Sequence, residues 1–117
     1  MADESLIFLA LLAASRPKTL MAAVLPVSLA TVLTYAIDES FNYILFGSII
    51  LSTLCIQIAT NLFNDAIDSK KGADTDKRIG PKRMASSGIL SPQSLIIAGS
   101  TFCLMAITFS LPLIVAR

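Results

Sequence analysis

The sequence contains no histidine and no tryptophan, and only 15% of its 117 residues are charged. Without histidine, the nucleophile–base pairs of Ser–His and Cys–His hydrolases cannot be built. The two cysteines, Cys55 and Cys103, lie in apolar stretches without metal-ligand spacing, so we interpret them as small hydrophobic residues. The net charge is +1 and the sequence has no basic stripe with interleaved aromatic residues, which argues against a nucleic-acid-binding protein.

Hydrophobic residues are abundant, at 55% of the chain, and the mean hydropathy is +0.76. The few charged residues fall in short clusters separated by long uncharged stretches, a pattern typical of membrane proteins. We therefore expect an all-α membrane protein with transmembrane helices at about residues 20–37, 43–63 and 95–116. An acidic turn at 38–40 and a long polar segment at 64–93 would join these helices.

Two local patterns add detail: one predicts a short helix before the first span, and the other predicts where the last span's helix begins. Residues 6–14 are apolar but too few to span a bilayer, and Asp3 and Glu4 precede them where a signal peptide carries positive charge. This stretch is expected to form an interfacial helix. Ser91 followed by Pro92 predicts the start of the last helix, because serine can cap free N–H groups and proline is tolerated at the first helical position.

The distribution of Lys and Arg predicts the orientation in the membrane. Arg16 and Lys18 flank the first span, residues 38–42 contain no basic residue, and residues 64–93 contain six. By the positive-inside rule, the N-terminus and the 64–93 loop are expected in the cytoplasm of a multi-pass cell-membrane protein.

One side of the second span becomes polar toward its end. At about 100° per residue, the polar side chains project within an arc of about 100°; they are Gln57, Asn61, Asn64, Asp65 and Asp68. Such groups at a membrane boundary are costly unless they face a cavity or a cation. Their hard oxygen atoms suit Mg²⁺, which commonly joins one or two carboxylates to the phosphate oxygens of a substrate.

The 64–93 segment also supplies the cations that a phosphate group requires. Its basic residues are Lys70, Lys71, Lys77, Arg78, Lys82 and Arg83. Arginine can hold phosphate oxygens through two parallel hydrogen bonds, so the segment is compatible with a magnesium-bound diphosphate. The alternative interpretation is that these residues only fix the topology and contact anionic lipid headgroups, while Asp74 and Asp76 belong to a solvated loop.

Two stretches of the sequence resemble a known family. These stretches, NLFNDAIDSKKGADTDKRIGPKRMASSGILSP at 61–92 and SRPKTLMAAVLPV at 15–27, are similar to the menaquinone-pathway branch of the UbiA superfamily of intramembrane prenyltransferases. The resemblance implies that residues 1–117 form the N-terminal part of one bundle of about eight or nine transmembrane helices. It also implies Mg²⁺-dependent transfer of a polyprenyl group from polyprenyl diphosphate to 1,4-dihydroxy-2-naphthoate in menaquinone biosynthesis.

The resemblance extends to the first Asp-rich motif of that family. Asn64 and Asp68 match its Asn-x-x-x-Asp-x-x-x-Asp pattern, but Gly72 stands where the last acid would be, so Asp74 or Asp76 would take that role. The candidate catalytic residues are Asn64, Asp65 and Asp68. The candidate metal ligands are Asn61, Asn64, Asp65, Asp68, Asp74 and Asp76. The candidate diphosphate-binding residues are Lys71, Arg78, Arg83, Arg16 and Lys18.

The second Asp-rich motif of the family has no counterpart in the sequence, and residues 94–117 contain no acidic residue. We therefore expect a fragment that is inactive without the missing half of its metal site. Two other hypotheses stay open. Asn61, Asp65 and Asp68 could form an intramembrane ion or proton relay of a transporter fragment, or the chain could be a truncated remnant without function.

Overall fold

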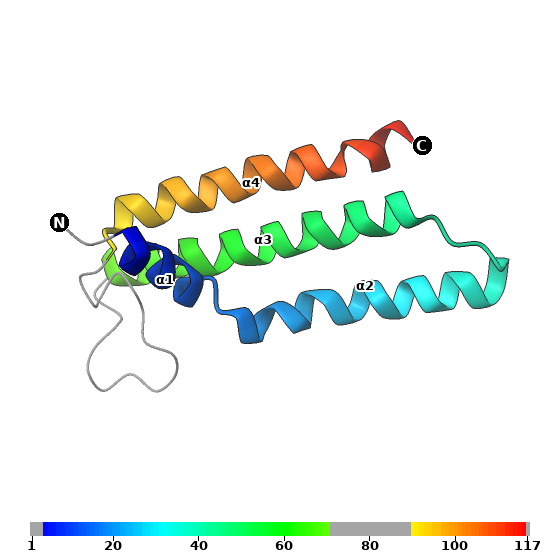
Figure 1. Cartoon of the computed structure of the whole chain (residues 1–117), viewed down its shortest axis with the longest axis horizontal. Helices are drawn as coiled ribbons and strands as arrows, with labels where there is room; N and C mark the ends of the chain where they lie inside the picture. The colour runs from blue at the N-terminus through cyan, green and yellow to red at the C-terminus, as the bar shows by residue number, and fades with distance from the viewer. Residues whose placement is uncertain (1–3, 71–89, 117) are drawn as a thin grey trace.

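The computed structural model describes residues 4–70 and 90–116, and every regular element within them is an α-helix. The helices are α1 (Glu4–Ala14), α2 (Pro17–Asp38), α3 (Tyr43–Lys70) and α4 (Pro92–Val115). Helices α2, α3 and α4 lie side by side with alternating directions, and α1 lies at the end where α3 finishes and α4 begins (Figure 1). Helices α2, α3 and α4 are long and apolar enough to cross a membrane, whereas α1 is shorter. The predicted all-α membrane fold with three spans is confirmed.

Helix α4 begins where the sequence predicts. The Ser91 hydroxyl oxygen accepts a hydrogen bond of 3.1 Å from the backbone N–H of Ser94, and Pro92 occupies the first turn. Proline at this position sacrifices no hydrogen bond, because the first N–H groups of a helix have no partner inside the helix.

The α2–α3 connection is a short turn over residues 39–42. Glu39 adopts a left-handed conformation (φ 54°) and donates its N–H to the carbonyl of Tyr35 at 2.8 Å, which closes α2. Asn42 starts α3, since its side-chain oxygen accepts from the N–H of Leu45 at 3.0 Å. Two antiparallel helices joined this closely form the hairpin that the acidic turn predicts.

Helices α3 and α4 extend beyond the predicted spans, because residues 64–70 continue α3 and residues 92–93 belong to α4. The reason is packing: Leu62 and Ala66 are almost completely buried at the end of α3. They belong to a small core at this end of the bundle, which comprises Ala10, Ala14, Leu62, Ala66, Leu90 and Leu95. Apolar contacts with α1 and α4 therefore stabilise the helix beyond the apolar stretch that ends at Phe63. The middle of the predicted 64–93 loop lies outside the described residues.

Helices α3 and α4 form the closest pair of the bundle. The Ser52 hydroxyl donates to the carbonyl of Ala106 across the interface at 3.2 Å. Gly99 of α4 lies against the ring of Phe63, which would be 2.9 Å from a Cβ atom built on the glycine. Small residues thus let the two helices approach, as is usual between membrane helices.

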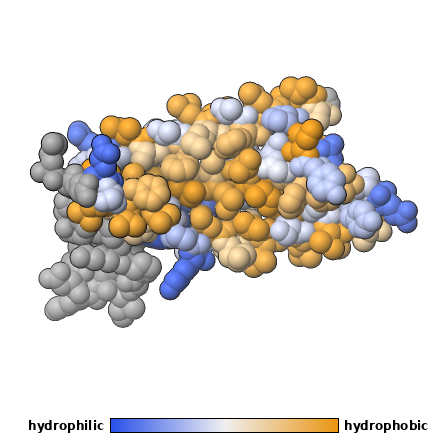
Figure 2. Space-filling view, viewed as in Figure 1, coloured by the Kyte–Doolittle hydropathy of each residue, from blue (hydrophilic) through white to orange (hydrophobic). Residues whose placement is uncertain are grey.

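Helix α2 contributes no buried residue to the described structure. Its large apolar side chains, such as Leu25, Leu29 and Leu33, are more than half exposed. Figure 2 shows that hydrophobic side chains cover most of the visible face, with the most hydrophilic ones toward the ends. Such a surface is stable where lipid rather than water surrounds the helices.

We predict that Gly99→Ala lowers the unfolding temperature, because its new methyl group must displace the Phe63 ring. Gly47→Ala is the matched control, since no atom lies within 4 Å of its added Cβ. Both changes gain about 1 kcal/mol of helix propensity, so their difference isolates the packing effect. Thermal unfolding of the purified protein in detergent measures it, and equal unfolding temperatures would contradict the close α3–α4 contact.

Candidate functional site

The polar face predicted from the sequence lies on the last turns of α3. Its residues are Gln57, Asn61, Asn64, Asp65 and Asp68, all within the helix. They do not share one environment: Asn61 and Asp65 are 4% and 2% exposed, Asp68 is half-buried, and Asn64 is exposed. The face therefore divides into a buried row, Asn61 and Asp65, and a more accessible row, Asn64 and Asp68.

Asn61 connects α3 to the turn between α1 and α2. Its side-chain nitrogen donates to the backbone carbonyl of Ser15 at 2.8 Å and to the hydroxyl oxygen of Thr19 at 2.9 Å. Its side-chain oxygen lies 3.5 Å from the side-chain nitrogen of Gln57, one turn earlier on α3. A buried carboxamide is costly unless it is hydrogen-bonded, and here both donor positions are used.

The turn held by Asn61 carries the two basic residues of the N-terminal flank. Arg16 is half-buried and has left-handed backbone angles (φ 51°, ψ 71°), while Lys18 is exposed. A residue other than glycine costs about 1 kcal/mol or more in this conformation, so the surrounding contacts must stabilise it. The hydroxyl and the backbone N–H of Thr19 both donate to the carbonyl of Arg16, at 2.8 and 2.9 Å. Arg16 and Lys18 thus lie at the same end of the bundle as Asp65 and Asp68 (Figure 1).

The donor chemistry at the end of α3 is suitable for a magnesium ion that also binds substrate phosphate. Asp65 and Asp68 are three residues apart on one helix and are therefore neighbours on its surface. Asn64 adds an accessible carboxamide oxygen in the same turn. Within residues 4–70 and 90–116, no three side chains of His, Cys, Asp or Glu come together as a metal-binding group. Two carboxylates are nevertheless enough for Mg²⁺ that shares its ligands with a phosphate group.

Several predicted site residues lie outside the described part of the chain. They are Lys71, Asp74, Asp76, Arg78 and Arg83. Their predicted roles stay predictions. The same holds for the metal-binding, catalytic or diphosphate-binding roles predicted for six described residues: Asn61, Asn64, Asp65, Asp68, Arg16 and Lys18.

Sequence reasoning missed the contacts between Asn61 and residues 15–19. Thr19 could have been found, because a buried asparagine in an apolar helix needs partners and Thr19 lies in the second resembling stretch. The Ser15 contact could not, since its acceptor is a backbone carbonyl, which every residue has.

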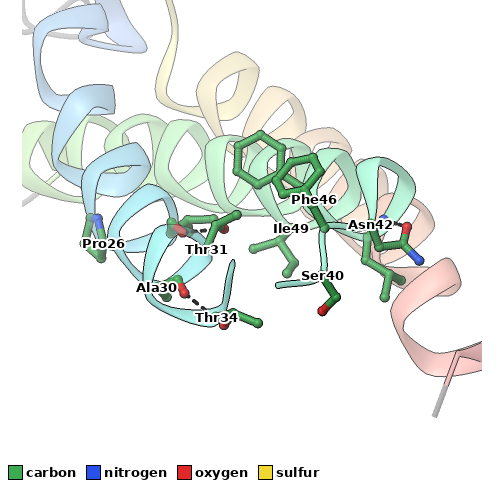
Figure 3. Close-up of a pocket in the computed structure, with 11 residues that line it drawn as sticks. Pro26, Ala30, Thr31, Thr34, Ser40, Asn42, Phe46 and Ile49 are labelled. Atoms are coloured by element: carbon green, nitrogen blue, oxygen red, sulfur yellow. Dashed lines mark hydrogen bonds between the residues drawn. The ribbon is translucent and has the colours of Figure 1, made fainter. Parts of the chain in front are cut away.

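A groove of about 500 Å³ lies between α2 and α3 near their connecting turn. In Figure 3, Pro26, Ala30 and Thr34 border it from α2, and Phe46 and Ile49 border it from α3. The Thr34 hydroxyl is bonded to the Ala30 carbonyl of its own helix at 2.9 Å. Among the described residues, none that lines this groove is charged, and the groove lies toward the opposite end of α3 from the polar face. It is therefore separate from the predicted diphosphate site.

Three curated proteins are similar to the chain, and all are named 1,4-dihydroxy-2-naphthoate octaprenyltransferase. The protein from Haemophilus influenzae is 37% identical over 82 residues, which cover 69% of this chain and 27% of the relative. The protein from Bacillus subtilis is 46% identical over 66 residues, or 56% and 21% of the two chains. The protein from Escherichia coli is 33% identical over 93 residues, or 76% and 30%.

The similar regions make up only 21–30% of the length of these relatives. No solved structure matches the chain. The profile of the UbiA prenyltransferase family matches residues 6–116, a region that includes most of α1, the Arg16 turn, the polar face of α3 and all of α4. The profile matches almost the whole sequence, and three helices are long and apolar enough to cross a membrane; the chain therefore belongs to the UbiA prenyltransferase family.

Proposed function

We propose that the chain contributes a magnesium–diphosphate site to the transfer of a polyprenyl group from polyprenyl diphosphate to 1,4-dihydroxy-2-naphthoate, a step of menaquinone biosynthesis. Membership of the family and the names of the three similar proteins support a prenyltransferase of this substrate class. The observation that carries the proposal is that the turn with Arg16 and Lys18 is hydrogen-bonded to α3 one helical turn before Asp65. Cationic and anionic groups are thereby held at one end of the bundle.

In this proposal Asn64, Asp65 and Asp68 hold the metal ion, and Asp74 or Asp76 completes the site. Bound Mg²⁺ supplies positive charge that neutralises the diphosphate and makes it a better leaving group. Arg16 and Lys18, with Lys71, Arg78 and Arg83, provide further cations for the negative charge that grows on the departing diphosphate. Apolar surroundings keep water away from the allylic carbon, so that the electron-rich naphthoate ring attacks it and the ring carboxyl group leaves as CO₂.

The proposal places the N-terminus and the 64–93 segment on the cytoplasmic side of the cell membrane. The end of the bundle with Arg16 and Lys18 is the more basic of the two described ends, whereas the α2–α3 turn carries Glu39 and no basic residue. The positive-inside rule favours the basic end in the cytoplasm, where the diphosphate group of a membrane-bound polyprenyl substrate would meet it.

We predict that Asp68→Asn in the full natural polypeptide reduces kcat/KM for prenyl transfer by more than about a hundredfold, since a metal-ligand charge is lost. Lys70→Ala, two residues away, serves as the control and should change kcat/KM by no more than a few fold, because one peripheral charge is worth little. Product formation from polyprenyl diphosphate and the naphthoate, measured against Mg²⁺ concentration, provides the comparison. Equal losses in the two variants would refute the assignment of Asp68. Cation flux without any prenylated product would instead favour the relay hypothesis.

Membrane orientation can be measured with single cysteines at Lys18 and Ser40, in a background in which Cys55 and Cys103 are replaced by alanine. A membrane-impermeant maleimide should label Ser40→Cys from outside intact cells, and Lys18→Cys only after the cells are opened. The cysteine-free background is the control for unspecific labelling. Labelling of Lys18→Cys in intact cells would contradict the proposed orientation.

A further inference from the structure

We infer that Asn61 is a positioning residue, which holds the turn with Arg16 and Lys18 in register with the acidic end of α3. The inference rests on the proposed function, because the register matters for a diphosphate that contacts both groups. It differs from the prediction that Asn61 binds the metal ion. In the described structure the amide nitrogen of Asn61 donates both of its hydrogen bonds to the turn, and its side-chain oxygen accepts from the side-chain nitrogen of Gln57.

The two donor bonds of Asn61 reach both sides of the turn. One goes to the carbonyl of Ser15 just before Arg16, at 2.8 Å, and the other to the hydroxyl of Thr19 just after Lys18, at 2.9 Å. Ser15 and Asn61 are 7% and 4% exposed, so water does not compete for the contact. One side chain of α3 therefore fixes the three residues 16–18 at both boundaries.

The direction of the hydrogen bonds makes an amide nitrogen necessary at this position. The Thr19 hydroxyl donates its proton to the carbonyl of Arg16 at 2.8 Å, so toward Asn61 it can only accept. The Ser15 carbonyl can likewise only accept. A carboxylate at position 61 would place an oxygen atom against two acceptors, although it has nearly the shape of the carboxamide.

The contact fixes where the turn lies relative to the acidic residues of α3. Asp65 follows Asn61 by four residues and Asp68 by seven, so both lie on the same side of α3 as the contact. Arg16 sits in an unfavourable left-handed conformation between two helices, and the bonds on either side of it keep the turn in that shape. A shift of about 1 Å in such a cationic group is enough to weaken its grip on a substrate.

The experiment compares Asn61→Asp with Thr19→Val in the full natural polypeptide. Both variants lose the bond between Asn61 and Thr19, and Asn61→Asp also loses the bond to Ser15. We expect KM for polyprenyl diphosphate to rise about tenfold in each, with kcat changed less and the Mg²⁺ dependence unchanged. Thr19→Ser, which keeps the hydroxyl, should restore the wild-type KM. Thr60→Val is the matched control on α3, because Thr60 is an exposed neighbour whose hydroxyl donates to the Ile56 carbonyl of its own helix.

Three kinetic results would overturn the inference. The first is a wild-type KM in Asn61→Asp. The second is an increased Mg²⁺ requirement in Asn61→Ala that Asn61→Asp restores, because an added carboxylate substitutes for a metal ligand but not for a hydrogen-bond donor. An effect of Asn61→Asp that persists undiminished when Arg16 and Lys18 are both alanine would also exclude action through the turn.

Hydrogen exchange separates failure of this inference from failure of the proposed function. The backbone amides of Ser15, Arg16 and Thr19 are bonded within the turn region, to Leu11, Ala13 and Arg16 respectively. Asn61→Asp should accelerate their exchange by about tenfold relative to Thr60→Val, whatever reaction the protein catalyses. Unchanged exchange refutes the positioning role even in an active prenyltransferase. Faster exchange in a protein that transfers no prenyl group supports the contact and refutes the function.

Discussion

Polar groups inside a membrane helix must find their partners within the protein, because lipid offers none. This constraint governs the end of the bundle that carries the proposed site, where Asn61 and Asp65 are almost fully buried near the end of α3. Asn61 meets it by binding the turn between α1 and α2, which ties the short helix α1 and the first span to α3. The location of Arg16 relative to the acidic residues is a consequence of how one carboxamide is satisfied.

The helices could be predicted from the sequence because charge and apolar length are strong signals in a membrane protein. Residues 20–37 and 95–116 fall inside α2 and largely inside α4, and the Ser91 cap lies where the serine–proline pair indicates. The last turn of α3 was predicted only in part. The spacing of the polar residues places Asn64, Asp65 and Asp68 on the helix, but the sequence does not mark its end at Lys70. Ala66 belongs to a buried cluster with residues of α1 and α4, and such contacts between distant segments leave no periodic pattern in the sequence.

The site was predicted in part. The residues of the polar face do lie together on one helix, since the geometry of a helix follows directly from residue spacing. Their division into a buried and an accessible row could not be foreseen, because it depends on where the α1–α2 turn docks. The resemblance of residues 15–27 and 61–92 pointed to both halves of the contact without showing that they touch. Only the distances between Asn61, Ser15 and Thr19 supply that link.

Helix α2 combines an exposed apolar side with one residue that is bonded to another helix, and the two differ in the substitutions that they allow. No residue of α2 is buried, whereas its first-turn Thr19 accepts a bond from another helix. Along the exposed side of α2, an exchange among leucine, valine, methionine and alanine breaks no contact within residues 4–70 and 90–116. At Thr19 only a hydroxyl-bearing replacement keeps the bond from Asn61, so a comparison of natural variants should find threonine or serine at this position.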